Sequence, residues 1–370
     1  MSLPLFIIVL ICLLAIFQVL EIYFFTRRHF ISGGLFAAFF WCIGIFLLFN
    51  AKILFSTNYP VDGTYKTRTI IIKKGTTLSK VAEQLYAEKL IRNKRYFIWT
   101  ANILGYQSRV KAGKFNVASH MSNYAIITLL TSTAMTQERI TVIEGMPARQ
   151  IASLAANRLD VDSLRFMKLV NDESTAHSLG IDAPSLNGYL FPETYNFTYG
   201  VTELEVIETL VNEFKKNIPD SLIIAAKNLG LTLHQVVTLA SIIEGEAAID
   251  EERPIISAVY HNRLKKRMKL EADPTVQYII PDGPRRLIQT DLTIDSPYNT
   301  YIYPGLPPEP INNPGRKSIS AAAFPAQVSY LYFVAKGDGS HAFSKTISEH
   351  LQAKNKFDKL RKELKNAVKK

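Results

Sequence analysis

The chain has 370 residues, of which 48% are hydrophobic, and its formal net charge at pH 7 is +11. This length is enough for two or three modest domains. Residues 351–370 hold eight Lys or Arg against Asp358 and Glu363, a net charge of +6, which leaves +5 for everything before them. The main body is therefore only mildly basic, which argues against a nucleic-acid groove.

Two apolar runs at the N-terminus predict a membrane anchor over residues 1–55. The runs cover 3–20 and 35–49, and each is near the length needed to cross the hydrocarbon core of a bilayer. The basic loop 27–29 between them should stay on the cytoplasmic side. We therefore expect two transmembrane spans in the cytoplasmic membrane, with the body after Phe55 on the external or periplasmic side. In the alternative, one of the runs is a buried hairpin partner.

The two cysteines, Cys12 and Cys42, both fall inside these runs. The external body therefore has no thiol, which excludes disulfides and cysteine zinc sites there. The chain has no HExxH string, and His341 and His350 are isolated from any carboxylate at ligand spacing. We expect no metal and no cofactor.

A linker over 56–66 leads to a predicted small module over 67–139. The expected order is a strand at 69–72, helices at 78–85 and 96–104, and a second strand or hairpin at 109–117. This order resembles the LysM-like module that binds glycan in many wall enzymes, a resemblance carried by Lys74-Gly75-Thr76-Thr77-Leu78 and Val81-Ala82 with Leu85. In the alternative, the module only spaces the next domain from the membrane.

Short strands and helices continue after the module, so the fold class is α+β. A strand is expected at 137–143, a helix at 149–159, and an aromatic turn at 187–195 with strand character on each side. At the C-terminus, residues 351–370 predict a basic amphipathic helix, either packed on the domain or bound to anionic lipid or wall polymer.

One predicted helix is apolar on most faces and ends in two glutamates. Thr232 and Gln235 have capping-box spacing, the run 236–243 is almost wholly apolar, and Glu244 and Glu246 follow it. A carboxyl at the end of a buried helix has a raised pKa, which suits a general acid. Two glutamates two residues apart point about 200° apart, so they cannot both serve one bond. Geometry alone does not choose between them.

A second helix is expected directly after these glutamates. Asp250 should cap it, with Glu251 and Glu252 in its first turn, where they complement the helix dipole. Pro254 is early enough in that helix to be tolerated.

An ordered set of short strings from 243 onward resembles one known family. The strings are Ile243-Glu244-Gly245-Glu246-Ala247, Asn262-Arg263-Leu264, Leu270-Glu271-Ala272-Asp273-Pro274-Thr275, Ser296-Pro297-Tyr298-Asn299-Thr300-Tyr301, Gly305-Leu306-Pro307-Pro308, Ile311-Asn312-Asn313-Pro314-Gly315, Tyr330-Leu331-Tyr332-Phe333-Val334 and Gly339-Ser340-His341. Together they resemble the MltG (YceG-like) family of endolytic peptidoglycan lytic transglycosylases. The resemblance covers roughly 140–350 and implies a catalytic domain with a lysozyme-like helical core.

The resemblance implies that Glu246 is the catalytic residue, because the family's catalytic glutamate is the second of the pair. Two positions depart from the family pattern: Ala247 stands where Thr or Ser is usual, and Glu271 where Gln is expected. Ala247 removes a hydroxyl contact, and Glu271 adds an ionisable group near the cleft. We expect the Glu271 carboxylate to raise the pKa of Glu246.

The implied reaction cleaves the bond between N-acetylmuramic acid and N-acetylglucosamine and leaves a 1,6-anhydro end. The resemblance also implies that this cleavage ends the elongation of nascent strands. Glu246 would act first as acid and then as base. The residues expected around the sugar are Asn262, Glu271, Asp273, Thr275, Tyr278, Asn299 and Tyr301, with turn or packing roles as the alternative.

Two other functions remain open at this stage. One is a hydrolytic muramidase in which Glu246 acts with Asp273 or Glu271 and a water molecule. The other is a non-catalytic membrane scaffold that binds glycan and docks wall synthases of the penicillin-binding-protein type. In each case the expected partners are peptidoglycan and the membrane, and no nucleic acid.

Overall fold

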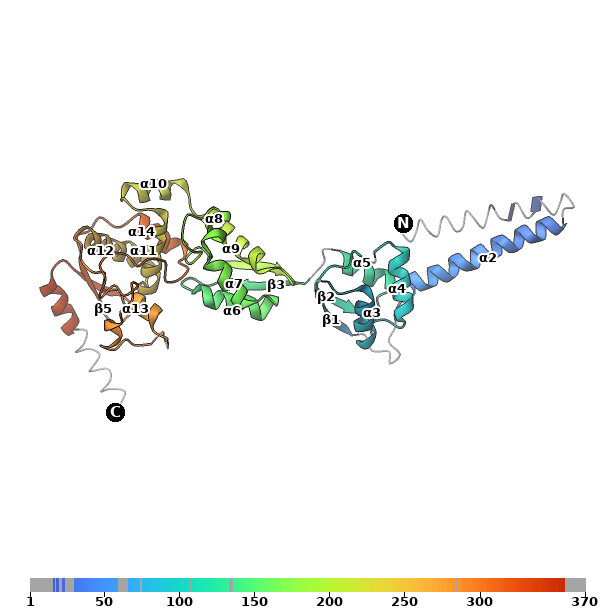
Figure 1. Cartoon of the computed structure of the whole chain (residues 1–370), viewed down its shortest axis with the longest axis horizontal. Coiled ribbons are helices and arrows are strands. Elements are labelled where there is room, and N and C mark those ends of the chain that lie inside the picture. Colours follow the sequence, from blue (N-terminus) through green and yellow to red (C-terminus); the bar gives the residue numbers. More distant parts are fainter. Residues whose placement is uncertain are drawn as a thin grey trace, which may run out of the picture. The chain divides into compact units, whose positions relative to one another are not determined.

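A computed structural model of the chain describes residues 16, 18–19, 22–23, 30–58, 66–73, 75–106, 108–132, 136–281, 283 and 285–356. The chain divides into two compact units. Unit 1 comprises Met1–Gln137 and Thr198–Gly200, and unit 2 comprises Glu138–Phe197 and Val201–Lys370. The colour scale of Figure 1 runs along the chain from unit 1 into unit 2.

The N-terminal part of unit 1 contains the long helix α2 (Phe30–Phe55). The first predicted apolar run, 3–20, lies almost wholly outside the described residues. Among the helices that the structure describes, none alone has both the length and the hydropathy of a membrane span. The apolar stretch Trp41–Phe55 is too short to count as a span. Among the described helices, one pair has the required length and hydropathy when its two members are taken together: α10 (Asp220–Asn228) and α11 (Leu233–Glu246), which are bent by 92° relative to one another.

The rest of unit 1 is a two-stranded sheet with three helices. Strands β1 (Thr67–Ile72) and β2 (Gly113–Ala118) are antiparallel, and α3 (Leu78–Ala87) and α4 (Lys94–Ile103) lie between them in the chain. Helix α5 (Asn123–Thr131) follows. The strand–helix–helix–strand order that the sequence predicts is present.

The core of this small sheet unit is apolar and closed. Ile70 lies opposite Phe115 in the strand pairing, and both side chains are buried. Helix α4 begins earlier than expected, because the Asn93 side chain accepts hydrogen bonds from the amides of Arg95 and Tyr96 and caps the helix there.

Unit 2 begins with a short sheet and four helices. Strand β3 (Gln137–Thr141) pairs with β4 (Thr194–Thr198). The helices α6 (Ala148–Leu159), α7 (Ser163–Val170), α8 (Glu173–Ser178) and α9 (Glu203–Asn217) each contribute buried side chains to the core of the unit. Strand character flanks the aromatic segment 187–195 only on its C-terminal side, in β4. Within the segment, Tyr189, Leu190 and Phe191 are buried. Packing in the core therefore fixes the position of this stretch, and strand pairing does not.

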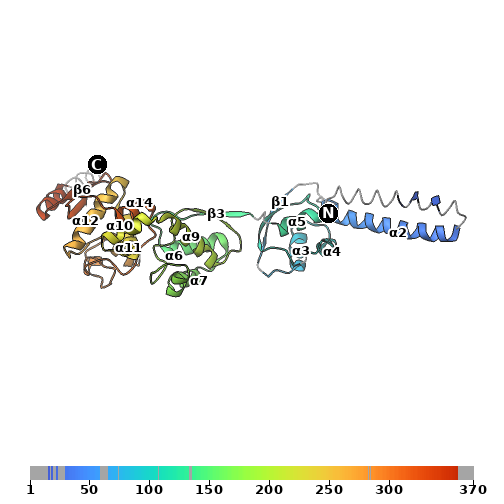
Figure 2. The same ribbon diagram turned by 90° about the horizontal axis from the view of Figure 1, so that it is seen from above.

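Helix α11 is the central element of unit 2. It packs against α12 (Arg253–Lys265), α13 (Asp273–Ile279) and α14 (Arg316–Ala323), and the labels of α12 and α14 flank it in Figures 1 and 2. Every side chain from Val236 to Ile243 is buried. The predicted capping box is present, since Thr232 accepts from the Gln235 amide while the Gln235 side chain accepts from the Thr232 amide.

The predicted cap at Asp250 is wrong. Asp250–Glu252 forms a 3-10 turn, η1, and α12 begins only at Arg253. Three residues before Arg253, the Asp250 carboxylate is placed to bind the Arg253 guanidinium at 2.9 Å, and it also pairs with Lys317.

The C-terminal part of unit 2 carries a 3-10 turn and a β-hairpin. The turn is η2 (Asp291–Thr293), and the hairpin pairs β5 (Tyr332–Ala335) with β6 (His341–Ser344). Residues 347–356 are helical, and the remainder of the predicted basic helix, 357–370, lies outside the described residues. The fold is thus a mixture of many helices and small sheets, which confirms the predicted α+β class.

Candidate active site

Glu246 is the last residue of α11, and its carboxyl group is only partly exposed. Its Oε1 accepts a hydrogen bond of 3.0 Å from the hydroxyl of Tyr260 on α12. Burial, followed by the negative charge of Asp273, raises the pKa of Glu246 to about 7, against the opposing effect of the Tyr260 hydrogen bond. Near neutral pH this side chain can therefore both give and take a proton.

The Glu246 carboxyl faces an open groove of about 430 Å³. The groove is formed by the loop that follows β3, the end of α11 and the first turns of α13. Its polar lining residues are Glu144, Arg149, Gln150, Glu246, Asp273, Gln277, Tyr278 and Asn312. A groove of this size with a proton donor among its lining residues can hold part of an extended polar substrate.

Glu244 points elsewhere and is held by the fold. Its side chain is 7% exposed and forms an ion pair of 3.1 Å with Arg253, while its other oxygen accepts from the Gly315 amide at 2.9 Å. The two glutamates between which sequence geometry could not choose therefore have different surroundings. Glu246 lines the groove, and Glu244 joins α11 to α12 and to the start of α14.

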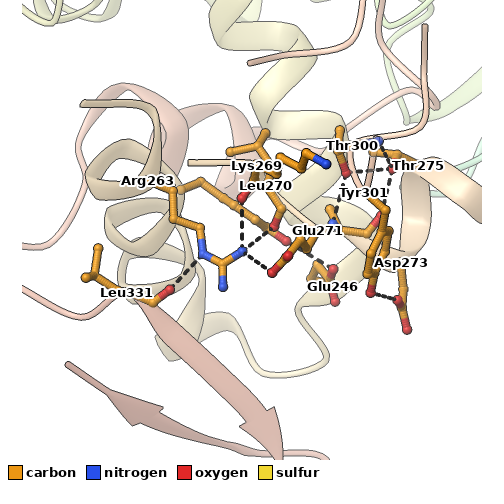
Figure 3. Close-up of polar contacts among 12 residues, drawn as sticks. Glu246, Arg263, Lys269, Leu270, Glu271, Asp273, Thr275, Thr300, Tyr301 and Leu331 are labelled. Atoms are coloured by element: carbon orange, nitrogen blue, oxygen red, sulfur yellow. Dashed lines mark hydrogen bonds and ion pairs between the residues drawn. The ribbon is translucent and has the colours of Figure 1, made fainter. Parts of the chain in front are cut away.

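Asp273 and Tyr301 form a polar pair beside Glu246 (Figure 3). The Tyr301 hydroxyl donates to Asp273 Oδ1 at 2.6 Å, and the Asp273 amide donates to the Glu246 carboxylate. Burial, then the hydrogen bond and charge of Asp273, raise the pKa of Tyr301 well above its usual value. Tyr301 therefore stays protonated and holds Asp273 as an acceptor.

Glu271 does not have the electrostatic role expected for it. Its Oε2 forms an ion pair of 3.0 Å with Arg263, and about half of its side chain is exposed to solvent. Figure 3 shows Arg263 also donating to the backbone carbonyls of Lys269, Leu270 and Leu331. The charge that adds to burial in raising the pKa of Glu246 is that of Asp273, while the Glu271 carboxylate is paired with a guanidinium.

Three of the residues expected around the sugar are occupied with internal hydrogen bonds. Asn262 donates to the carbonyls of Val328 and Tyr330, and Asn299 donates to those of Leu292 and Ile294. Thr275 is fully buried and exchanges a hydrogen bond with Thr300. These three side chains hold loops of unit 2 in place and do not line the groove, whereas Asp273 and Tyr278 do.

Sequence reasoning did not single out Tyr260, Glu144 or Asn312. Tyr260 reaches Glu246 only because α12 packs on α11, and Glu144 and Asn312 line the groove from distant parts of the chain. No local pattern marks such contacts. Ala247 is buried, its amide donates to Ile243, and it offers no hydroxyl to the site.

The described residues contain no group of three His, Cys, Asp or Glu side chains that is able to hold a metal ion. The chemistry that the described groove offers is that of a partly buried carboxyl group, Glu246, with the carboxyl groups of Asp273 and Glu144 and the hydroxyls of Tyr260 and Tyr301 near it.

Comparisons with known proteins converge on one family. The sequence model of the YceG-like family matches residues 70–356. A protein of Bacillus subtilis (strain 168) named endolytic murein transglycosylase is 36% identical over 315 residues, covering 80% of this chain and 87% of that protein. A protein of the same name from Streptococcus pneumoniae (serotype 2, strain D39) is 26% identical over 347 residues, covering 83% of this chain but only 62% of the pneumococcal protein.

A solved structure supports the same relation. The crystal structure of a yceG-like protein from Listeria monocytogenes is 30% identical, with a TM-score of 0.54, and the match covers 77% of this chain and 98% of that one.

Proposed function

Because the chain belongs to the YceG-like family, we propose that it is an endolytic lytic transglycosylase that cleaves the glycan strands of peptidoglycan. The observation that carries the proposal is Glu246, a partly buried carboxyl with a pKa near 7 at the floor of the groove. The relatives named above supply the reaction class, and the geometry supplies the residue.

Glu246 in its protonated form would donate to the oxygen that links N-acetylmuramic acid to N-acetylglucosamine. As that bond breaks, positive charge develops on the muramic acid ring, which the negative charge of Asp273 favours. The 6-hydroxyl of the same sugar then attacks the anomeric carbon and gives its proton back to Glu246. One bond breaks, one C–O bond forms, and the product is a 1,6-anhydro end with no water consumed.

We further propose that the protein is held in the cytoplasmic membrane and acts on strands as they are made. Apolar residues dominate 3–20 and 35–55, and large apolar side chains of α2, among them Phe39, Trp41 and Phe46, are exposed. Exposed apolar side chains in such number suit lipid contact. Cleavage close to the membrane would end strand elongation, beside synthases of the penicillin-binding-protein type.

We propose that unit 1 presents a LysM-like, glycan-binding module. Its support is the β1–α3–α4–β2 order and the antiparallel pairing of the two strands. Such a module would bind the same strands that the catalytic unit cleaves.

The test is digestion of purified sacculi by the full-length protein and by Glu246→Gln, with mass spectrometry of the released fragments. The expected result is 1,6-anhydro ends from wild-type protein and no release by Glu246→Gln. An unfolding temperature of Glu246→Gln no lower than that of wild type is the check on folding. Reducing ends in place of anhydro ends would indicate a hydrolytic muramidase. No release by wild-type protein would indicate a non-catalytic scaffold.

A second variant, Glu244→Gln, tests which of the two glutamates is the catalytic one. Removing a charge from a buried ion pair destabilises a protein, by about 3–5 kcal/mol when the partner is left unpaired, and less here because Gln keeps an acceptor. We expect a lower unfolding temperature but most of the activity per folded molecule. A folded but inactive Glu244→Gln beside an active Glu246→Gln would reverse the assignment.

A further inference from the structure

The groove at Glu246 continues into a second pocket. The two pockets, of about 430 and 380 Å³, share the lining residues Pro147, Arg149, Tyr278, Ile311 and Asn312. Beyond this junction the second pocket is lined by Met167, Asn171, Asn187, Gly188, Tyr298 and Asn313, among others. A polymer that lies across Glu246 can therefore extend past the junction.

Arg149 is the cation at the junction. It lies in the first turn of α6 with its side chain exposed, and its charge acts on the partly buried Tyr278. Among the lining residues of the two pockets that the structure describes, Arg149 is the only Lys or Arg. It forms no ion pair with another described residue.

The positive charge of the Arg149 guanidinium is therefore opposite to the charges of the other ionisable groups that line the groove. The first pocket otherwise carries the carboxyl groups of Glu144, Glu246 and Asp273. An anionic group on a bound strand would be repelled there and attracted at the junction. A guanidinium binds a carboxylate through two parallel hydrogen bonds, which fixes its position as well as its charge.

Asn312, also at the junction, has an acceptor without a donor. Its Nδ2 donates to the Ser241 carbonyl at 2.8 Å, while its Oδ1 is buried and no described group donates to it. A buried acceptor left unpaired is unfavourable by about 1–3 kcal/mol, so a bound group that donates to it gains affinity. Sugars with N-acetyl groups offer both N–H and O–H donors.

The wall of the second pocket suits a sugar ring. The rings of Tyr278 and Tyr298 lie 4.9 Å apart, and the Tyr298 hydroxyl is held by Glu309. Glu309 also accepts from Ser185 and from Asn187. The aromatic wall is thus fixed in place by a carboxylate behind it.

We propose that Arg149 binds the carboxylate carried by the muramyl residues of a strand and so sets the register in which the strand crosses Glu246. The neighbouring sugar then occupies the second pocket and donates to Asn312. Only every second sugar of a strand carries the substituent with the carboxylate. A strand held by Arg149 can therefore shift only by two sugars at a time, so the bond that lies at Glu246 is always of the same kind. This inference rests on the proposed function.

The test measures binding of defined glycans to the full-length protein in the Glu246→Gln background, where nothing is cleaved. The probes are strands stripped of peptide, which carry a free lactyl carboxylate, strands that keep their peptides, and N-acetylglucosamine oligomers without a carboxylate. Arg149→Gln should raise Kd about tenfold for carboxylated strands and leave the oligomers unchanged. Arg149→Lys should restore part of the loss. Arg158→Gln, at the other end of α6 and outside both pockets, is the matched control.

Each outcome of this experiment has a distinct meaning. A loss with peptide-free strands identifies the lactyl group as the source of the carboxylate, and a loss confined to peptide-bearing strands identifies the peptide. Equal Kd values for Arg149→Gln and Arg158→Gln on both carboxylated probes would overturn the role of Arg149. Absence of anhydro products from wild-type protein would refute the proposed reaction instead, so the two failures remain distinguishable.

The second pocket is tested by Asn312→Ala and Tyr298→Ala in otherwise wild-type protein. Both should raise KM for long strands several-fold more than for strands too short to pass the junction. Because Asn312 also binds Ser241, thermal unfolding is measured alongside, and Tyr298→Ala provides the independent variant. A KM for long strands that neither variant changes would refute the assignment of this pocket.

Discussion

At the scale of single residues, two carboxylates near Glu246 differ in whether a cation is paired with them. Glu271 is paired with Arg263 at 3.0 Å, whereas Asp273 is bound by a tyrosine hydroxyl, which carries no charge. Only Asp273 therefore adds to burial in raising the pKa of Glu246.

This difference predicts how the pH dependence of cleavage responds to substitution. Glu246 acts first as an acid, so activity should fall as pH rises through about 7. Asp273→Asn removes a negative neighbour, which favours the ionised form of Glu246 and lowers its pKa. The basic limb of the kcat/KM profile should then move to lower pH, by up to about one unit.

Glu271→Gln is the matched control and should leave that limb in place. Both profiles come from initial rates of fragment release between pH 5 and 9, with folding checked at each pH. A larger displacement by Glu271→Gln than by Asp273→Asn would contradict the account.

The limits of sequence reasoning are clear at this scale. The buried run of α11 pointed to the pair Glu244 and Glu246, and the resemblance to the family, whose catalytic glutamate is the second of the pair, selected Glu246. The choice between Asp273 and Glu271 was not available, because it depends on Arg263, a residue of α12 whose guanidinium turns toward the 269–271 loop. Tyr260 and Asn312 were missed for the same reason: contacts made through space leave no spacing pattern in the chain.

At the scale of elements, the β5–β6 hairpin packs against the tyrosine that binds Glu246. His341 on β6 contacts the Glu252 carboxylate through its ring Nδ1 at 2.7 Å, and its amide donates to the same carboxylate. Phe333 on β5 packs edge-on against Tyr260, with ring centroids 5.9 Å apart. The hairpin thus fixes the tyrosine that holds Glu246.

Substitution of His341 should therefore affect a group that it does not touch. His341→Ala releases the hairpin from η1, and we expect kcat to fall several-fold while KM changes little. Since the Tyr260 hydrogen bond lowers the pKa of Glu246, its weakening should move the basic limb of the profile to higher pH. Tyr260→Phe should move the limb in the same direction. Wild-type kcat and an unmoved limb in His341→Ala would show that the hairpin has no part in positioning Glu246.

Element prediction succeeded where the signal is local and failed where it is not. The capping box of α11 and the β1–α3–α4–β2 order follow from neighbouring residues. Asp250 has the side chain of a helix cap, but the attraction of Arg253 and Lys317 gives its carboxylate partners that are not backbone amides. The segment 187–195 has strand-like composition, yet burial of its aromatic side chains fixes it without a ladder.

At the scale of the whole molecule, the proposed membrane anchor makes a prediction about sidedness. Reporter fusions placed after residue 55 should be active only outside the cytoplasmic membrane, because the basic loop 27–29 favours the inside. Cysteines introduced at Arg27 or Arg28 should be shielded from a reagent that cannot cross the membrane. Cytoplasmic reporter activity from the body after residue 55 would refute both the topology and access to peptidoglycan.

The groove carboxyl also links the folding of the protein to pH. An unfolded chain ionises Glu246 near pH 4.5, whereas the folded protein keeps its proton until about 7. Between these values folding takes up a proton, so stability is lost as pH rises through this window. Above pH 7 the penalty is complete and is on the order of 3 kcal/mol.

Glu246→Gln removes this proton uptake and should make an inactive protein more stable than the wild type. The gain in unfolding temperature should be near zero at pH 4.5 and full at pH 8, measured by thermal unfolding of both proteins side by side. A gain that does not depend on pH would mean that the carboxyl ionises freely in the fold. The same burial that raises the pKa of Glu246 for catalysis thus makes the folded protein bind a proton that the unfolded chain releases. The free energy of unfolding should therefore fall with rising pH, up to the pH at which Glu246 loses the proton that the reaction needs.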